Sequence, residues 1–319
     1  MRKVRFGIIG AGKIAKKFVQ AVQNTDCAQI AAVASKTPER AEEFARLNDI
    51  ESFCDYETLV GRSDIDAVYI ATTHNFHYEN IKLCLDAGKH VLCEKPMVLT
   101  EKDASELFES ARSKGLFLME AMWTRFLPSM RKAKQWIEEG RIGKIQTLSG
   151  MIAFKGNEDP ENRLINASLA GGALYDVGVY MIEIASFLAG EHITDAVGKI
   201  RRDHRTGVDV VSSFILSFET VDASLQCLVT SDTKEYFIVS GDAGYIEIPR
   251  SHVSDECFLY GEDMKLTEHF KQEFPEGNGF VYEIEETVRC INSGMTESEI
   301  MPAQATVECA RVFEKLLSD

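Results

Sequence analysis

The first part of the chain alternates short apolar runs with amphipathic stretches. The apolar runs predict buried strands at residues 4–9, 30–34, 67–71, 91–93 and 116–119. The stretches between them have the period of helices and lie at residues 14–22, 38–46, 78–86 and 100–112. Thr100 can cap the last of these helices, with Asp103 in the capping-box position. This alternation of strand and helix predicts a parallel sheet with right-handed crossovers.

After about residue 120 the pattern changes. Helices are expected at residues 129–138, 172–188, 280–291 and 303–317. A strand is expected at residues 145–154, and the segment 196–248 has the period-two alternation of several further strands, such as 211–218 and 224–229. Asp242-Ala243-Gly244 is typical of a hairpin turn. The second part is therefore expected to be an α+β domain on a large, mostly antiparallel sheet.

The composition narrows the kinds of partner that this protein can have. The formal net charge of -15 argues against nucleic acid and against an anionic membrane surface, because both need clustered cations. No signal-type segment follows Met1-Arg2-Lys3, and no apolar run approaches the length of a membrane span. The eight cysteines form no C-x-x-C pair and have no histidine at zinc-ligand spacing. We expect a cytoplasmic protein with reduced thiols and no metal.

A glycine-rich segment joins the first strand to the first helix. Its sequence, Gly10-Ala11-Gly12-Lys13-Ile14-Ala15, has the form G-x-G-x-x-A. The first glycine permits a tight turn, the second lets the backbone approach a pyrophosphate, and the alanine keeps the helix close to the sheet. The phosphates would lie on the helix N-terminus, where free N–H groups point outward. Because the strand before it and the helix after it are both present, the segment predicts a dinucleotide site in a Rossmann domain.

The end of the second strand bears on the choice between NAD and NADP. An NAD enzyme usually has an acidic residue there for the ribose 2′-OH, whereas this chain has Ser35 and Lys36 and no acid before Glu39. Ser35 can donate to a 2′-phosphate, Lys36 can pair with it, and Arg40 follows one helical turn later. The alternative is a solvated basic loop. We expect NADP(H) to be preferred over NAD(H).

Candidate catalytic residues lie in both parts of the chain. Glu94-Lys95-Pro96 ends an apolar run that predicts a strand, so Lys95 is expected at the carboxyl edge of the parallel sheet, where such sheets bind ligands. Asp176 and Tyr180 are four residues apart in a predicted helix and would share a face. A phenol accepts a proton only where a nearby cation stabilises its phenolate, and Lys95 can be that cation. Taken singly, each of these residues also has an ordinary structural explanation.

Further candidates follow other strands of the predicted parallel sheet. Trp123 and Arg125 come after its last strand. An indole there would exclude water from a nicotinamide, and the arginine could pair with a phosphate or with an acidic group. The alternative there is a hinge packed by aromatic side chains. The loop after the third strand contributes the remaining cofactor candidates, Thr72, Asn75 and His77. Asn75 could bond a ribose, whereas His77 also fits a structural role at the start of the next helix.

With these residues assembled, the chain resembles the Gfo/Idh/MocA oxidoreductase family over essentially its whole length. The segments that carry the resemblance are G-A-G-K-I-A at 10–15, E-K-P at 94–96, G-A-L-Y-D-V-G-V-Y at 172–180 and E-A-M-W-T-R-F at 120–126. The last is similar to the branch with dimeric dihydrodiol dehydrogenases and NADP-dependent D-xylose dehydrogenases. Two departures are Thr73, where the family often has proline, and Ala170, which replaces a glycine; both bear on substrate fit.

The resemblance implies a set of roles and an architecture. It implies Lys95 and Tyr180 as catalytic residues, Asp176 as a catalytic substrate contact, and a cis Lys95–Pro96 bond. The domains expected are a Rossmann domain for NADP at 1–121 and an α+β domain at 122–319 for substrate binding and dimerisation through an open sheet. The last helix belongs to the second domain in this division, with packing back toward the first domain as the alternative. The expected cofactor-binding residues are Gly10, Gly12, Lys13, Ile14, Ser35, Lys36, Arg40, Thr72, Asn75, His77, Glu94, Lys95, Trp123 and Arg125.

The expected function is hydride transfer between NADP and a secondary alcohol of a sugar, a polyol or a trans-dihydrodiol. Trp123, Phe154, Asp176 and Tyr180 are the candidates for contact with that substrate. One alternative is an oxidoreductase that keeps NADP tightly bound and shuttles hydride between two substrates. Another is a nucleotide-sensing protein without turnover, which would have no need of Lys95, Asp176 and Tyr180 together.

Overall fold

The computed structural model describes residues 2–318, which form two compact units. The first unit contains the chain up to Val98 together with Lys102–Trp123 and Phe274–Val307. The second contains Leu99–Glu101, Thr124–Glu273 and the chain from Glu308 onward. A segment from late in the sequence, with helix α8 (Phe280–Asn292), therefore belongs to the first unit, where it packs against α1 (Lys13–Gln23).

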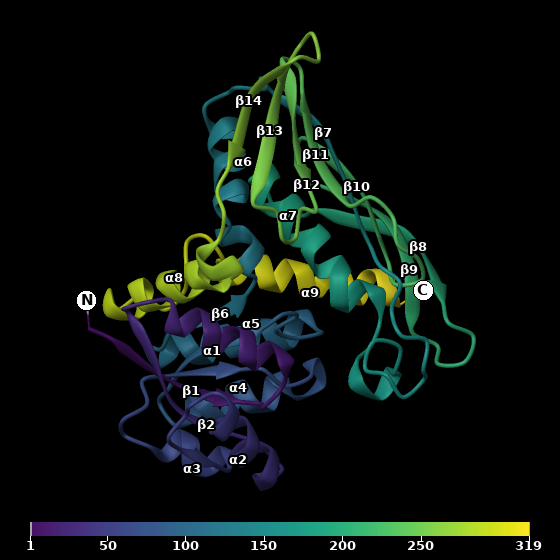
Figure 1. The fold of residues 1–319 in the computed structure, drawn as a ribbon. Helices are drawn as coiled ribbons and strands as arrows, with labels where there is room; N and C mark the ends of the chain where they lie inside the picture. Colours follow the sequence, from purple (N-terminus) through teal and green to yellow (C-terminus); the bar gives the residue numbers. More distant parts are fainter. Residues whose placement is uncertain (1, 319) are drawn as a thin grey trace. The chain divides into compact units, whose positions relative to one another are not determined.

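The first unit is built on a six-stranded sheet in which every pair of neighbours is parallel (Figure 1). Its order is β3-β2-β1-β4-β5-β6, and the strands are β1 Val4–Ile9, β2 Ala28–Ala34, β3 Phe53–Cys54, β4 Ala67–Ile70, β5 His90–Glu94 and β6 Leu118–Ala121. The order reverses between β1 and β4, which makes the carboxyl ends of these strands the expected place for a ligand. The predicted Rossmann sheet is confirmed.

The helices of the parallel sheet follow the predicted alternation. They are α1, α2 (Pro38–Leu47), α3 (Tyr56–Gly61), α4 (His77–Asp86) and α5 (Glu101–Ser113). The sequence analysis missed α3 and the two-residue strand β3, because elements this short carry too few residues to show a period. A side-chain cap supports α3, since the Asp55 carboxylate accepts a hydrogen bond of 2.7 Å from the Thr58 N–H.

The second unit is built on an eight-stranded sheet with the order β14-β13-β12-β11-β7-β10-β9-β8. Only β7 and β10 pair in parallel, so the prediction of a mostly antiparallel sheet is confirmed. The strands are β7 Ile145–Ala153, β8 Asp195–Arg202, β9 Asp209–Ser217, β10 Asp222–Leu228, β11 Tyr236–Gly241, β12 Gly244–Pro249, β13 Glu256–Gly261 and β14 Leu266–Lys271. Asp242 and Ala243 form the predicted hairpin turn, since Gly241 pairs with Gly244.

Helices cover one face of this antiparallel sheet. Helices α6 (Pro128–Glu138) and α7 (Val179–Ala189) pack against each other and lie along the same face (Figure 1). Burial alternates along β9 and β10, with every second residue buried, because one face of the sheet meets the helices and the other is open. The last helix, α9, covers Ala303–Leu317.

The segment around Tyr180 is a long apolar helical stretch. Residues Ala167–Ala189 are long enough to cross a membrane and contain an 18-residue window with a mean hydropathy of 1.3, although the sequence analysis expected no such run. In the protein, 78% of that window is buried, as in the core helix of a globular domain. Within it, a π-helical turn, η4 (Leu174–Gly178), runs directly into α7.

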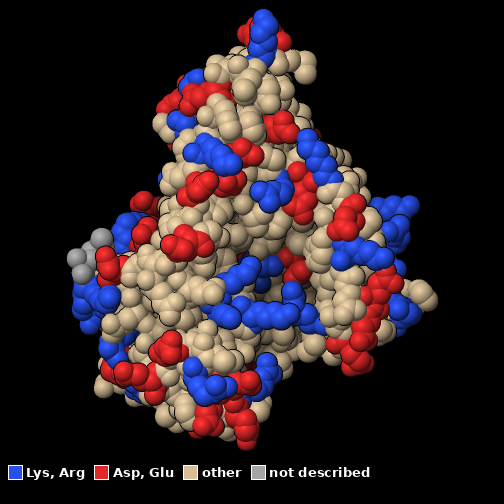
Figure 2. Space-filling model, viewed as in Figure 1, with Lys and Arg blue, Asp and Glu red and all other residues tan. Residues whose placement is uncertain are grey.

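The charge of the chain is spread over its surface. Acidic and basic side chains are interspersed over the face in Figure 2. Many of the exposed pairs are close enough for ion pairing, such as Lys82 with Asp86 at 2.7 Å and Lys114 with the same carboxylate at 2.5 Å. The net charge of -15 is therefore compatible with local basic positions of the kind that an anionic cofactor needs.

Candidate functional site

The glycine-rich segment forms a tight connection between β1 and α1. Gly10 has a φ of 107° and donates its N–H to the Ala34 carbonyl at 2.9 Å. A Cβ at Gly10 would lie 2.8 Å from the carbonyl carbon and oxygen of Ala71, at the end of β4. Only glycine fits this position, because both the conformation and the space exclude a side chain.

The start of α1 is open to a ligand. Gly12 stands at the N-cap, no side chain caps the helix, and no acidic residue lies in its first turn. A Cβ at Gly12 would meet no atom within 4 Å. Lys13 is exposed and Ile14 half-buried beside it. Backbone N–H groups, the helix dipole and an uncrowded approach are what a pyrophosphate requires, so these residues fit a dinucleotide.

The end of β2 presents the residues expected to discriminate NADP from NAD. Ser35 is buried, and its Oγ accepts a hydrogen bond of 3.3 Å from the Thr37 N–H. The ammonium group of Lys36 lies 4.1 Å from the ring centroid of Phe76, which follows β4. Arg40 is exposed in the first turn of α2. Two cations and a hydroxyl at this strand end are suited to a phosphate, and the exposed Phe76 offers a flat surface beside them.

His77 contacts the backbone of the loop after β4 and of the loop after β5. The ring is fully buried, with Nδ1 2.9 Å from the Pro96 carbonyl and Nε2 3.0 Å from the Thr72 carbonyl. Burial lowers the pKa of His77, which favours the neutral ring. His77 therefore links the loops that follow β4 and β5. Asn75 is exposed in the same loop, and its Oδ1 accepts a hydrogen bond of 2.8 Å from the Thr73 hydroxyl.

Lys95 follows the last residue of β5 and precedes a cis proline, as the resemblance implied. Next to it, Glu94 is buried and accepts hydrogen bonds from the Tyr69 hydroxyl and, at 3.3 Å, from the Lys95 N–H. Burial raises the pKa of Glu94, against the opposing effects of Tyr69 and Lys95. Glu283 of α8 is fully buried near it, and burial together with Glu94 raises the pKa of Glu283 well above its ordinary range. Sequence reasoning gave no sign of this second carboxyl group.

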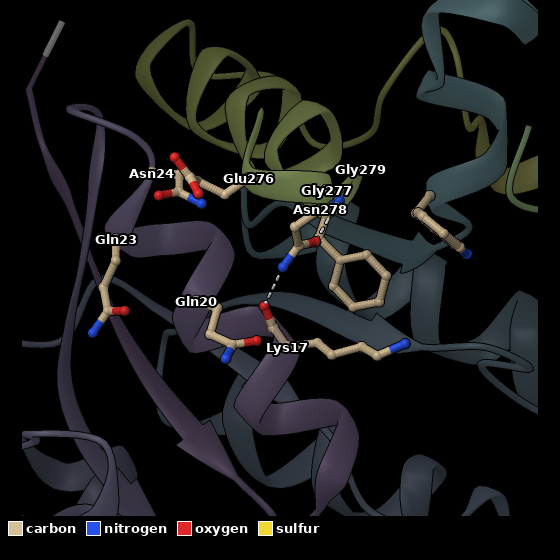
Figure 3. A pocket seen from close by; sticks show the side chains of 10 residues that line it. Lys17, Gln20, Gln23, Asn24, Glu276, Gly277, Asn278 and Gly279 are labelled. Carbon is tan, nitrogen blue, oxygen red and sulfur yellow. Dashed lines mark hydrogen bonds between the residues drawn. The ribbon is translucent and has the colours of Figure 1, made fainter. Parts of the chain in front are cut away.

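Trp123 lies at the edge of a pocket in the first unit. Its ring meets that of Phe280 edge to face, with centroids 5.0 Å apart. The pocket has a volume of about 510 Å³, and Figure 3 shows polar side chains of α1 on one side and the segment 276–279 on the other. The Asn278 amide donates to the Lys17 carbonyl at 2.8 Å and ties the two sides together (Figure 3).

Arg125 is buried within the second unit. Its guanidinium lies 2.7 Å from the carboxylate of Glu183 on α7, and both side chains are almost wholly enclosed. Burial raises the pKa of Glu183, while Arg125 lowers it. The pair anchors α7, one turn beyond Tyr180, against the segment after Trp123. The partner of Arg125 is thus an acidic side chain of the protein, one of the options that the sequence left open.

The predicted Asp–Tyr pair spans the junction of η4 and α7. Asp176 lies in the π-helical turn, where its Oδ1 accepts a hydrogen bond of 3.0 Å from Arg163. Tyr180 lies in the first turn of α7 and is 8% exposed. Phe154, half-buried, follows β7 directly. No sequence motif marks the segment that contains Arg163. The irregular turn at η4 is a geometry that recurs at functional sites.

A buried carboxylate fixes the start of this helical stretch. Asp209 is 1% exposed, and its Oδ2 accepts hydrogen bonds from the Leu174 N–H at 2.6 Å and from the Ser212 hydroxyl at 3.1 Å. Gly172 has a φ of 139°, and a Cβ there would lie 2.1 Å from Asp209 Oδ1. Gly172, the first residue of the motif at 172–180, therefore makes room for the capping carboxylate. Sequence reasoning missed Asp209 because it is far along the chain from Gly172 and Leu174, which it contacts.

The candidates fall into two groups. In the first unit, sheet topology brings the ends of β1, β2, β4 and β5 to one edge, and the candidates there are Gly10, Gly12, Lys13, Ile14, Ser35, Lys36, Arg40, Thr72, Asn75, His77, Glu94 and Lys95, with Trp123 after β6. The second unit holds Arg125, Phe154, Asp176 and Tyr180. Among residues 2–318 there is no group of three histidine, cysteine or acidic side chains that could hold a metal.

Comparison with protein families gives two matches. Residues 4–122 match the profile described as an oxidoreductase family with an NAD-binding Rossmann fold, GFO_IDH_MocA. Residues 130–247 match the profile described as the GFO/IDH/MocA C-terminal domain.

Individual proteins are similar over nearly the whole chain. Trans-1,2-dihydrobenzene-1,2-diol dehydrogenase of Mus musculus is 32% identical over 98% of this chain and 95% of its own length. A 3-ketoreductase from Actinomadura kijaniata, solved with NADP and TDP-benzene, is 26% identical with a TM-score of 0.86, covering 99% of this chain and 98% of that one. Aldose-aldose oxidoreductase from Caulobacter crescentus, solved with glycerol, is 26% identical with a TM-score of 0.87, covering 98% and 96%.

Proposed function

This chain belongs to the Gfo/Idh/MocA family of oxidoreductases, and from that premise we propose that it is an NADP(H)-dependent dehydrogenase acting on a secondary alcohol of a sugar, a polyol or a trans-dihydrodiol. The observation that carries the proposal is the similarity to a dihydrodiol dehydrogenase along 98% of the chain. It is supported by Lys95 at the carboxyl end of β5 and by Asp176 and Tyr180 at the start of α7.

In this proposal the residues of the chain handle the proton. When bound, the nicotinamide supplies the acceptor for the hydride that leaves the substrate carbon. Tyr180 accepts the hydroxyl proton as a phenolate, and the Lys95 ammonium group stabilises that phenolate. Asp176, held by Arg163, accepts a hydrogen bond from a substrate hydroxyl and orients it. Trp123 excludes water, and Phe154 forms part of the substrate wall.

The catalytic assignment is tested with Lys95→Met and Tyr180→Phe. Each substitution removes the proton-handling group and keeps most of the side-chain volume, so kcat is expected to fall by at least about 100-fold. NADPH binding should be unchanged in Tyr180→Phe, whereas Lys95 is itself an expected cofactor contact, so Lys95→Met is assayed at saturating NADP. The measurement is NADPH formation across aldoses, inositols and trans-dihydrodiols, with binding followed by fluorescence titration. The matched controls in the first unit are Lys102→Met, at an exposed helix position, and Tyr78→Phe, at a half-buried one whose hydroxyl bonds Glu106. Variants that bind NADPH and turn over at the parent rate would refute the assignment.

The preference for NADP is tested at Lys36. Lys36→Asp places a negative charge where we propose the 2′-phosphate to lie, so NADP binding should weaken about tenfold more than NAD binding. Dissociation constants of both nucleotides are measured on the wild type and on the variant. Lys102→Asp makes the same charge change at a side chain that is 81% exposed and should alter neither constant. An equal loss of affinity for NADP and NAD would contradict the preference.

A second enzymatic function has its own support. The similarity to aldose-aldose oxidoreductase favours a variant of the proposal in which NADP stays bound and carries hydride from a hydroxyl-bearing carbon of one substrate, which is oxidised, to the carbonyl of a second, which is reduced. NADP that remains with the protein through gel filtration, with one substrate oxidised as a second is reduced, would favour this shuttle. Release of free NADPH in each turnover would favour the dehydrogenase.

The proposal includes a homodimer in the cytoplasm. The open face of the antiparallel sheet carries Val197 and Ile215, which are directly paired across β8 and β9 and are 55% and 42% exposed. On other strands of this sheet, Tyr245 and Tyr260 stack with centroids 4.5 Å apart. Exposed apolar and aromatic side chains on an open sheet face are suited to a second copy of the chain, as either a dimer or a dimer of dimers. Eight free cysteines fit a reducing compartment.

A further inference from the structure

The backbone that follows Lys95 is held by buried side chains from two other elements. The peptide group between Pro96 and Met97 has one carbonyl and one N–H. The Pro96 carbonyl lies 2.9 Å from Nδ1 of His77, at the start of α4. The Met97 N–H donates to Oε1 of Glu120, on β6, at 3.0 Å. Both polar groups of this peptide therefore have a side-chain partner, and both partners are buried.

Glu120 also bonds a segment that comes from late in the chain. Its Oε2 accepts a hydrogen bond of 2.8 Å from the hydroxyl of Thr306, which is 3% exposed. The same segment bonds β6 itself, because the Leu118 N–H donates to the Thr296 carbonyl at 3.1 Å. All of these residues belong to the first unit. Glu120 thus links the loop after β5 to a segment that is nearly 200 residues away along the chain.

The strand before Lys95 is fixed by the sheet. Cys93 pairs with Glu120, and Glu94 pairs with Ala121, in the parallel ladder of β5 and β6. Lys95 therefore lies between a strand of fixed register and a peptide whose two polar groups are bonded. Because the chain is held on both sides, the backbone position from which the Lys95 side chain extends is well defined.

The two bonds of Glu120 do not depend on whether its side chain is ionised. A carboxylate and a carboxylic acid both keep an oxygen that can accept from the Met97 N–H. The Thr306 hydroxyl can donate to a carboxylate oxygen and can also accept from a carboxylic acid. The role of Glu120 is therefore a matter of geometry, and it should be the same across the pH range of the folded protein.

We propose that Glu120, braced by Thr306, is a positioning residue that acts through Lys95 by fixing the loop after β5. The inference rests on the proposed function, in which the Lys95 ammonium group stabilises a phenolate. No bond to Glu120 forms or breaks in the reaction. Its effect is on the placement of the lysine, and a misplacement of about 1 Å can lower a catalysed rate about 100-fold.

Glu120→Gln and Glu120→Leu test this role as a matched pair. Glutamine has the shape of glutamate, its amide oxygen can accept from the Met97 N–H, and its NH₂ group can donate to the Thr306 hydroxyl. The kcat of Glu120→Gln should therefore stay within about threefold of the wild type. Leucine has no acceptor, so the Met97 N–H loses its partner and kcat should fall about 10- to 100-fold.

A double-mutant cycle shows whether Glu120 acts through Lys95. In the Lys95→Met background, Glu120→Leu should change kcat by less than about twofold, because no lysine is left to position. All values are measured at saturating NADP. Thr287→Val is the control for a general loss of stability, since it removes a buried hydroxyl that donates to the Glu283 carbonyl at 2.7 Å in the same unit. It should lower Tm and leave kcat unchanged.

The placement of Lys95 can also be followed without turnover. Reductive methylation with isotopically labelled formaldehyde gives NMR signals for the lysine side chains, and the Lys95 signal is the one missing from Lys95→Met. This signal should move or broaden in Glu120→Leu and stay in place in Glu120→Gln and Thr287→Val. The signal of Lys102, whose side chain is 81% exposed, should stay in place in every variant.

Two results would overturn the proposal: a Lys95 signal that stays in place in Glu120→Leu, or a fold-loss of kcat in that variant that is the same with and without Lys95. If Glu120→Leu fails to fold by circular dichroism, Thr306→Val takes its place, with Thr306→Ser as the variant that keeps the hydroxyl, and the same criteria apply. A wild type that oxidises no alcohol would refute the proposed function, while the Lys95 signal would still decide the role of Glu120.

Discussion

At the scale of single residues, burial controls the ionisation of Glu283. No pattern in the sequence distinguishes this glutamate from its acidic neighbours in the same helix. Three acidic residues stand close together in α8, at positions 283, 285 and 286. Glu285 is exposed, Glu286 is bonded to Arg289 at 2.8 Å, and Glu283 is enclosed near Glu94. The same residue type therefore has three different electrostatic environments within one helical turn, and only the packing around the helix decides which is which.

This environment predicts a pH dependence of stability. The folded-state pKa of Glu283 is raised, so its favourable contribution is complete below the unfolded-state pKa and is lost as the pH rises toward the folded-state value. Glu283→Gln stays neutral, so the fall in Tm between pH 5 and pH 8 should be smaller than in the wild type by about 3 °C. Differential scanning calorimetry measures the Tm at both pH values. In Glu285→Gln, at the exposed position, the Tm should fall as much as in the wild type. An equal fall of Tm in the wild type and in both variants would contradict the prediction.

The sequence predicted site residues wherever a short motif requires a particular residue type. It did not predict which side chains those residues contact. The sequence named Lys95, Asp176 and Tyr180 as candidates, but not Arg163 beside Asp176 or His252 beside Tyr180. For Arg125 the sequence indicated only an anionic partner, and the structure identifies that partner as Glu183. A partner is set by contacts between residues that lie far apart along the chain, and a single sequence contains no signal for such a pairing.

At the scale of elements, the two glycines of the β1–α1 connection serve different purposes. Gly10 is needed for the fold, because its φ of 107° and the nearby Ala71 carbonyl exclude a side chain. Gly12 has a φ of -109°, which any residue can adopt, and a Cβ there meets no atom within 4 Å. The space beside Gly12 is thus available to a ligand and is not required by the packing of the protein.

Substitution by alanine should separate these purposes. Gly10→Ala should destabilise the protein by about 1–3 kcal/mol, the usual cost of a strained backbone position. Gly12→Ala should change the free energy of unfolding by less than about 0.5 kcal/mol but weaken NADP binding about tenfold, since its methyl group meets the pyrophosphate. Urea unfolding and nucleotide titration give the two quantities. Unchanged NADP affinity in Gly12→Ala would count against a pyrophosphate at the start of α1.

Element prediction succeeded where a period could develop. Apart from β3, the strands of the parallel sheet lie within a few residues of their predicted positions, and so do the helices α1, α2, α4, α5, α6, α8 and α9. The elements that it missed are β3, α3, β13 and β14. The first two are too short to show a period, and the last two follow residue 248, where the predicted strands stopped. The π-helical turn before α7 was read as ordinary helix, because both have similar apolar patterns.

At the scale of the whole molecule, the open face of the eight-stranded sheet exposes apolar side chains that would remain in water if the chain were a monomer. Val197 and Ile215 lie side by side on it, and burial on the opposite face shows that the sheet already has its core. Exposed apolar side chains that lie together on an open sheet face favour association with another surface. The proposed homodimer would cover them.

Ile215→Lys should disrupt this association. A lysine in the middle of the paired surfaces would have to be desolvated, so the variant should sediment as a monomer at concentrations where the wild type is a dimer. Analytical ultracentrifugation gives the mass. Leu47→Lys, on α2 at a side chain that is 62% exposed, is the control and should leave the assembly intact. A monomeric wild type, or a dimeric Ile215→Lys, would refute the proposed interface.

The sequence by itself determined the alternation of elements, the glycine positions of the β1–α1 turn and the residue types for acid–base chemistry, because these depend on local periodicity and backbone geometry. Only the tertiary structure decided that α8 joins the first unit, that Asp209 caps the segment before Tyr180, and that His252 with Glu235 faces that phenol. The physical reason is the range of the interactions: hydrogen bonds and charges between distant segments exist only after the chain has folded.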